Sequence, residues 1–202
     1  EIFRSATWLR AIEIAQKGGT LHFLGLLSDG NVHSHISHLF ALLDDAAKHG
    51  VKRARLHVLA DGRDVDEKSA LRYIDALEKH LAALNLGDRD YRIASGGGRM
   101  IVTMDRYNAD WRIVERGWKA HVLGQARAFA SATEAVQTYY NEDPRVTDQY
   151  LDSFVIAENG KPIGTIQDGD AVVTFNFRGD RVIEISQAFD QDEFTHFDRQ
   201  RR

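Results

Sequence analysis

The sequence lacks cysteine entirely. Disulfide bonds, thiol catalysis and thiolate metal sites are therefore excluded. It also lacks an apolar run near the roughly 20 residues that cross a bilayer, and its first residues show no signal-peptide pattern. We therefore expect a soluble, cytoplasmic protein with no membrane partner. The chain opens at Glu1, inside an amphipathic stretch, which suggests a piece of a longer protein.

The sequence also has no excess of positive charge. Lys and Arg number 26 against 30 Asp and Glu, for a formal net charge of -4. Such a balance gives no general attraction to nucleic acid or to an anionic membrane, so any anion binding must be local. With 43% hydrophobic residues among 202, the chain can bury a core of its own. We expect one domain over residues 1–202.

Apolar runs alternate with helical patterns along the chain. Each run ends in a turn sequence, and a stripe with helical spacing follows it. The expected strands cover residues 20–27, 55–60, 91–94 and 171–177, with a hairpin within 154–166. Because parallel neighbours need helical crossovers, this order predicts an α/β fold, a three-layer α/β/α sandwich with a mostly parallel sheet.

Polar residues gather where the expected strands end. The four clusters cover residues 29–38, 61–64, 95–106 and 178–181. Ligands of open α/β sheets bind beyond the carboxyl ends of the strands, so these clusters are expected to meet at one site. Five of their residues carry guanidinium groups, which match phosphate or carboxylate oxygens bidentately: Arg63, Arg99, Arg106, Arg178 and Arg181. One such arginine alone indicates a salt bridge, but five indicate a site for a small polyanion.

The histidine cluster leaves two interpretations open. His33, His35 and His38 lie near Asp29, and paired histidines with an aspartate can bind zinc or manganese. Alternating histidines at a helix start point in different directions, which favours one histidine as an anion contact. Four further histidines are expected at surface or core positions without a chemical role: His22, His49, His57 and His80.

Asp64 and the glycine run at 96–98 are two further candidates for a chemical role. Asp64 is either a proton carrier or an acid at the start of a helix. Gly96–Gly98 is expected to form a loop whose N–H groups can approach an anion, although it matches no nucleotide-binding fingerprint. No serine lies in a Gly-x-Ser-x-Gly elbow, so a serine nucleophile is not indicated.

Four motifs in order resemble those of the cofactor-independent phosphoglycerate mutases. They are Leu-Ser-Asp-Gly-Asn-Val-His-Ser-His at 27–35, Asp-Gly-Arg-Asp at 61–64, Ser-Gly-Gly-Gly-Arg at 95–99 with Met-Asp-Arg at 104–106, and Asn-Phe-Arg-Gly-Asp-Arg at 176–181. The spacing between Arg99 and Arg106 is that of the family's longer-loop form. Asn31 stands where glycine is frequent. The resemblance extends over nearly the whole chain.

This resemblance implies a function and a division of labour. The family has an alkaline-phosphatase-like domain, with a serine nucleophile and two divalent metals, usually manganese, and an inserted α/β domain that grips phosphoglycerate. The chain resembles only the insert, so no metal and no cofactor are expected in it. The implied reaction interconverts 3-phosphoglycerate and 2-phosphoglycerate in glycolysis and gluconeogenesis, through a phosphoserine on the other domain.

The resemblance also assigns roles to residues. Asp64 is implied as the one catalytic residue, a proton shuttle. The implied substrate contacts are His33, Arg63, Asp64, Arg99, Arg106, Arg178 and Arg181. Two alternatives remain: a stand-alone metal-dependent hydrolase built on His33, His35 and His38, and a non-catalytic anion-binding module.

Overall fold

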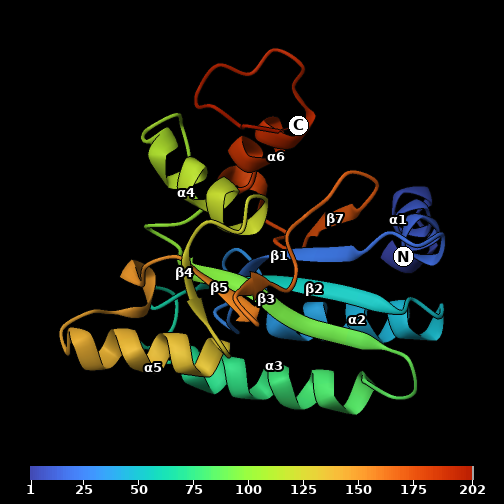
Figure 1. Cartoon of the computed structure of the whole chain (residues 1–202), viewed down its shortest axis with the longest axis horizontal. Coiled ribbons are helices and arrows are strands. Elements are labelled where there is room, and N and C mark those ends of the chain that lie inside the picture. The colour runs from blue at the N-terminus through green and yellow to red at the C-terminus, as the bar shows by residue number, and fades with distance from the viewer. Residues whose placement is uncertain (202) are drawn as a thin grey trace.

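A seven-stranded sheet with helices on both faces forms the body of the chain (Figure 1). The structure is a computed structural model, and it describes residues 1–201. The strands are β1 (Leu21–Leu27), β2 (Arg53–Ala60), β3 (Asp90–Gly98), β4 (Arg127–Phe129), β5 (Phe154–Glu158), β6 (Lys161–Pro162) and β7 (Ala171–Thr174). Their order in the sheet is β4-β5-β3-β2-β1-β7, and β6 pairs with β5.

Six α-helices and three 3-10 turns surround the sheet. The helices are α1 (Ala6–Gln16), α2 (Ile36–Lys48), α3 (Ala70–Leu84), α4 (Trp111–His121), α5 (Ala132–Glu142) and α6 (Ile183–Asp190). The 3-10 turns are Ile2–Arg4, Asp148–Tyr150 and Gly179–Arg181. Within the described residues, none of these helices combines the length and the apolar character needed to cross a membrane.

The sheet is mostly parallel, as the sequence predicts. β7, β1, β2 and β3 run parallel, whereas β5 is antiparallel to β3. Every residue of β1 is buried, which is typical of a central parallel strand covered on both faces. The predicted hairpin is present as β5 and β6. The α/β fold and the α/β/α layering are confirmed.

The helices divide between two apolar cores. One core contains Trp8 of α1, Leu39 of α2 and Leu77 of α3, and the other contains Trp118 of α4 and Ile185 of α6. Figure 1 shows α2, α3 and α5 below the sheet and α4 and α6 above it. The helices that follow the neighbouring strands β1 and β7 thus cover opposite faces. Such a reversal opens a crevice at the carboxyl ends of the strands, where ligands of α/β proteins bind.

Three boundaries differ from the sequence prediction. Gly96–Gly98 is part of β3 rather than a loop. Residue 96 must be glycine because a Cβ atom there would lie 2.4 Å from the carbonyl oxygen of Val58 on β2. The helix after β2 begins at Ala70, so Asp64 does not lie at a helix start. β7 ends at Thr174, and beyond it the Asn176 side chain accepts a hydrogen bond from the main-chain N–H of Leu26 at 3.0 Å.

Gly96→Ala is expected to lower the free energy of unfolding by about 1–3 kcal/mol, because β2 and β3 must separate to admit the methyl group. Urea denaturation followed by circular dichroism measures the change. Gly179→Ala is the matched control, since a Cβ atom there meets nothing within 4 Å. An unfolding free energy of Gly96→Ala equal to that of the control would contradict the close approach of the two strands.

Candidate functional site

The predicted anion-binding residues all follow carboxyl ends of parallel strands. His33 follows β1, Arg63 and Asp64 follow β2, Arg99 and Arg106 follow β3, and Arg178 and Arg181 follow β7. We call these seven residues the anion site. The main chain ties the segments together, since the N–H of Arg178 donates to the carbonyl of His33 at 3.2 Å and that of Arg99 to Ala60 at 3.1 Å.

A buried ion pair lies at the base of the anion site. Arg99 Nη1 donates to Asp61 Oδ1 at 2.7 Å and to Asp64 Oδ2 at 2.6 Å. The side chains of Arg99 and Asp61 are each only 1% exposed. Burial alone would raise the pKa of Asp61, but hydrogen bonds from the Ser28 hydroxyl, the main-chain N–H of Asp64 and Arg99 lower it overall. Asp61 is thus charged at neutral pH and holds Arg99 in one orientation.

On the side of the anion site opposite Asp61, the carboxylate of Asp180 contacts several of the cationic residues. Its carboxylate lies 3.0 Å from Arg178 Nε, 3.2 Å from Arg106 Nη1 and 3.5 Å from His33 Nδ1. Burial acts to raise the pKa of Asp180, but Arg106, Arg178 and His33 together lower it below its usual value. The sequence motif at 176–181 contains Asp180 but does not predict contacts with several segments. In the structure one carboxylate joins the segments after β1, β3 and β7.

Arg181 lies among the other cations of the site. Its side chain is buried, and Nη1 donates to the carbonyl of Met104 at 2.7 Å. Burial lowers the pKa of Arg181, and the charges of Arg106, Arg99 and Arg63 lower it further, against the opposing effect of Asp180. These guanidinium groups are therefore close enough to repel one another. A bound anion would relieve that repulsion.

Among residues 1–201, two buried guanidinium donors in the anion site lack a hydrogen-bond partner. In the described part of the chain, Nε of Arg99 and Nε of Arg181 are buried without a hydrogen-bond partner. Buried N–H groups are nearly always hydrogen-bonded in proteins, so unpaired ones need a reason. Both belong to residues that the sequence motifs single out. An oxyanion supplies the acceptor oxygens that they lack.

His33 and Arg63 complete the set in different ways. Burial and the nearby Arg99 lower the pKa of His33, so its ring is neutral at neutral pH and can donate one hydrogen bond to a ligand. The side chain of Arg63 is exposed, and its main-chain N–H donates to Asp61 Oδ1 at 3.2 Å. Among residues 1–201 its guanidinium has no ion-pair partner. It remains available to an anion from the solvent side.

The histidine cluster does not assemble into a metal site. The ring of His35 accepts from the main-chain N–H of Ser37 at the start of α2, and the ring of His38 packs edge-on against Phe177. Over the described residues, no three or more His, Asp or Glu side chains are grouped so that they could hold a metal ion. In residues 1–201, His33, His35 and His38 thus lack the grouping that a metal ion needs.

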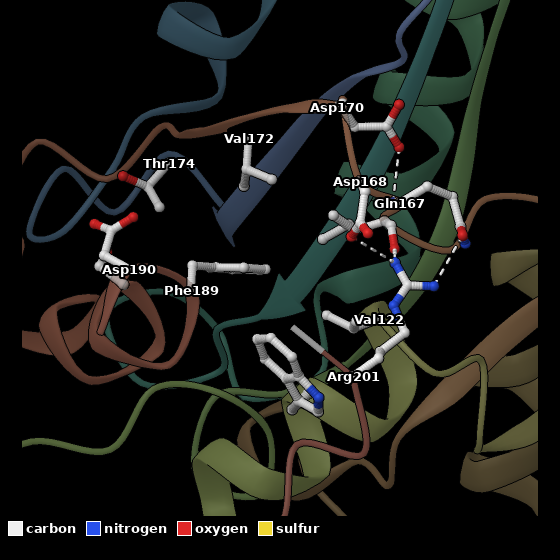
Figure 2. Close-up of a pocket in the computed structure, with 13 residues that line it drawn as sticks. Val122, Gln167, Asp168, Asp170, Val172, Thr174, Phe189, Asp190 and Arg201 are labelled. Atoms are coloured by element: carbon white, nitrogen blue, oxygen red, sulfur yellow. Dashed lines mark hydrogen bonds and ion pairs between the residues drawn. The ribbon is translucent and has the colours of Figure 1, made fainter. Parts of the chain in front are cut away.

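A cavity of about 410 Å³ lies elsewhere, between α4, α6 and the start of β7 (Figure 2). Its walls include Trp118, Phe189 and the carboxylates of Asp168 and Asp190. The guanidinium of Arg201 is already bound to the carbonyl of Ile166 and the side chain of Gln167. Among the described residues this cavity offers carboxylates and no cation without a partner, so it does not suit an anion. The candidates for anion binding are the arginines of the anion site.

Asp61→Asn is expected to lower the free energy of unfolding by about 3 kcal/mol at neutral pH, because it leaves Arg99 buried without its charged partner. The folded-state pKa of Asp61 is lowered, so its contribution is fully present above its unfolded pKa of about 3.9 and is lost as pH falls through the folded value. Urea unfolding at neutral and at acidic pH should therefore show that the deficit shrinks below about pH 4.

Asp66→Asn, on the same loop but exposed, is the control for that experiment and should change the free energy of unfolding by less than about 0.5 kcal/mol. A deficit of Asp61→Asn that is the same at both pH values would show that charge is not its cause.

Comparison with known proteins places this geometry in a family. A family model described as BPG-independent PGAM N-terminus matches residues 1–202. The chain is 58% identical over 200 residues to the probable 2,3-bisphosphoglycerate-independent phosphoglycerate mutase of Leptospira interrogans, covering 98% of the chain and 36% of that relative. With the Trypanosoma brucei brucei 2,3-bisphosphoglycerate-independent phosphoglycerate mutase, 58% identity extends over 188 residues, 93% of the chain and 34% of the relative.

A solved structure agrees. The crystal structure of Leishmania mexicana phosphoglycerate mutase at low cobalt concentration superposes with a TM-score of 0.97 at 52% identity, over 99% of this chain and 37% of that protein. The chain thus spans only about a third of the length of the relatives it matches. On this evidence of sequence and fold, the chain belongs to the family of the BPG-independent phosphoglycerate mutase N-terminus.

Proposed function

We propose that residues 1–202 form the single substrate-binding domain of a two-domain, cofactor-independent phosphoglycerate mutase. The whole protein interconverts 3-phosphoglycerate and 2-phosphoglycerate, a step of glycolysis and gluconeogenesis in the cytoplasm. The observation that carries this proposal is the convergence of five arginines at the carboxyl ends of parallel strands, with the buried Nε–H groups of Arg99 and Arg181 unpaired.

The charge of the anion site suits a phosphoglycerate. Five arginines face the three carboxylates of Asp61, Asp64 and Asp180, and the neutral His33 leaves an excess of two positive charges. Phosphoglycerate carries a phosphate and a carboxylate, and each can accept the paired N–H groups of a guanidinium. In this proposal Arg99 and Arg181 bind from the buried side, while the more exposed arginines bind from the solvent side.

Asp64 is the proposed catalytic residue. One of its oxygens, Oδ2, accepts from Arg99, and its side chain is 15% exposed, so it can reach a ligand. In this role Asp64 takes the proton from the substrate hydroxyl whose oxygen attacks the phosphorus atom, and returns it when the phosphoryl group leaves. Phosphoryl transfer depends largely on positioning and charge stabilisation, which the arginines supply.

The proposed partner is a phosphatase-like domain of the same protein, outside this chain. It carries the serine nucleophile and two divalent metals, manganese in this proposal. Because the residues of this chain do not fit a metal, its own work is limited to binding the substrate, orienting it and moving a proton. The isolated chain is therefore an anion-binding module without turnover.

Calorimetric titration with 3-phosphoglycerate tests the proposal. The chain is expected to bind with an affinity that falls as salt rises and does not depend on manganese. Arg178→Ala is expected to weaken binding by about ten- to hundredfold, because it removes a charge-assisted contact. Arg145→Ala is the matched control, since Arg145 is 92% exposed and pairs with Asp143 outside the site.

Equal affinity of the two variants would remove the anion site from the proposal. Binding that requires manganese would instead favour the metal-dependent hydrolase built on His33, His35 and His38. Absence of binding by the parent chain would contradict the proposed substrate.

A further inference from the structure

A chain of hydrogen-bonded side chains crosses the sheet inside the protein. We call it the relay, and its members in spatial order are Asp170, His22, His57, Ser95, His121 and Thr103. The successive donor–acceptor distances are 3.0, 2.9, 2.6, 2.7 and 2.8 Å. The three histidines are fully buried. They come from β1, β2 and α4, so the relay joins three elements that are distant in sequence.

A bulge in β3 completes the relay. The register between β2 and β3 shifts by one residue, so that Leu56 pairs with Ile93 but His57 pairs with Ser95. In an unshifted register His57 would pair with Ala94, which has no hydroxyl. Bulges re-aim side chains in this way and are frequent beside functional sites. The same bulge brings Ser95 within 2.7 Å of His121 Nδ1.

The hydrogen bonds of the relay have one direction. Burial lowers the pKa of His22 and His57, and that of His121 to about 3, so all three rings are neutral and each carries one N–H. Burial acts to raise the pKa of Asp170, but hydrogen bonds from His22 and from the main-chain N–H groups of Thr20 and Gln167 lower it overall. The carboxylate is therefore charged and accepts the hydrogen bond from His22.

Because the Asp170 carboxylate can only accept, the donor of each successive hydrogen bond in the relay is fixed. His22 donates from Nε2 to Asp170, and His57 donates from Nε2 to His22. Ser95 donates its hydroxyl proton to Nδ1 of His57 and accepts from Nδ1 of His121. The free Nε2 of His121 then accepts from Thr103.

Thr103, the far end of the relay, has an unusual backbone. Its φ is 69°, in the left-handed region that β-branched residues rarely adopt. Thr103 also lies close against α4: a Cβ atom at Gly117 would lie 2.1 Å from Thr103 Oγ1, so only glycine leaves room there. Strained residues of this kind persist only where their surroundings hold them, and they concentrate at functional sites.

The strained residue leads directly into the anion site. The next carbonyl, that of Met104, accepts the hydrogen bond from Arg181 Nη1, and Arg106 follows two residues later with its ion pair to Asp180. A rotation of Thr103 into an ordinary conformation would move this carbonyl and release Arg181. The backbone at Thr103 therefore sets the position of two of the five arginines.

We propose that the relay is a positioning device for the anion site, which holds Thr103 in its left-handed conformation and so fixes the Met104 carbonyl that orients Arg181. This inference rests on the proposed function of the anion site. Its outer end, Asp170, lies in the wall of the cavity in Figure 2, beside Gln167. The relay residues touch no ligand, so they are positioning residues rather than catalytic ones.

Stability alone does not require a buried network of hydrogen-bonded side chains such as the relay. Buried polar groups lose hydration, and well-packed apolar side chains of similar volume are often equally stabilising. A fully satisfied buried network instead selects one arrangement of the groups it joins. Here the group at its end is the residue whose conformation the anion site needs.

The first test is independent of any ligand. Long-range ¹H–¹⁵N spectra of the ¹⁵N-labelled chain at neutral pH are expected to show neutral rings, with the proton on Nε2 in His22 and His57 and on Nδ1 in His121. The Nδ1–H form of His121 is the decisive signature, because an isolated neutral imidazole prefers Nε2–H. A proton on Nε2 of His121, or a charged His22, would reverse the relay and overturn the proposal.

The second test compares Thr103→Val with Thr103→Ser. Valine keeps the branched shape but removes the hydroxyl, whereas serine keeps the hydroxyl. Thr103→Val is expected to shift the Nε–H resonance of Arg181 and to weaken 3-phosphoglycerate binding by about tenfold or more, and Thr103→Ser is expected to restore both. Thr133→Val, exposed on α5, is the matched control.

Ser95→Ala supplies the same test without touching the loop, should Thr103→Val fail to fold. It cuts the relay at its centre and is expected to shift the Arg181 resonance in the same way. An unchanged Arg181 resonance in either folded variant overturns the relay as a positioning device. If the parent chain binds no phosphoglycerate, the proposed function fails, while the tautomers and the Arg181 resonance still decide on the relay.

Discussion

The buried pair of Arg99 and Asp61 is the constraint on which the rest of the site depends. A guanidinium that is 1% exposed must have a charged partner, because an uncompensated charge in the interior is strongly destabilising. Asp61 meets that need only because Ser28 and the main chain after β2 also bind its oxygens. The carboxyl ends of β1, β2 and β3 are thereby held to one geometry. A second carboxylate, Asp180, connects the segment after β7 to those after β1 and β3.

Much of this could be predicted because it depends on strand ends. The apolar runs and the clusters after them are local patterns, and parallel topology converts them into one site without knowledge of any contact. The errors came from tertiary contacts. Gly96–Gly98 reads as a loop in sequence, but it is part of β3, where the close approach of Val58 and Phe154 requires glycine at residue 96. Asp64 reads as a helix-start acid, yet the helix begins at Ala70 and Asp64 pairs with Arg99.

The relay was outside the reach of sequence reasoning for a physical reason. Its neighbours are separated along the chain by 148, 35, 38, 26 and 18 residues, so no periodicity connects them. From the sequence, His22 and His57 are expected at surface or core positions without a chemical role. Their contact depends on the register of β1 against β2, and that of His57 with Ser95 depends on a bulge. Register is a property of the sheet, not of either strand.

Two kinds of buried polar group, charged carboxylates and neutral side chains, therefore have different roles in the site. Carboxylates pair with the arginines while no anion is bound. In the proposed relay, neutral side chains hold the backbone at Thr103, whose neighbour Met104 accepts from Arg181 and which leads to Arg106. A charged group could not replace His57 or His121, because burial opposes protonation at both positions. Conversely, neutral partners could not offset five guanidinium groups. The arrangement keeps Nε of Arg99 and Arg181 unpaired and oriented before a ligand arrives, so less of the binding free energy is spent on ordering them.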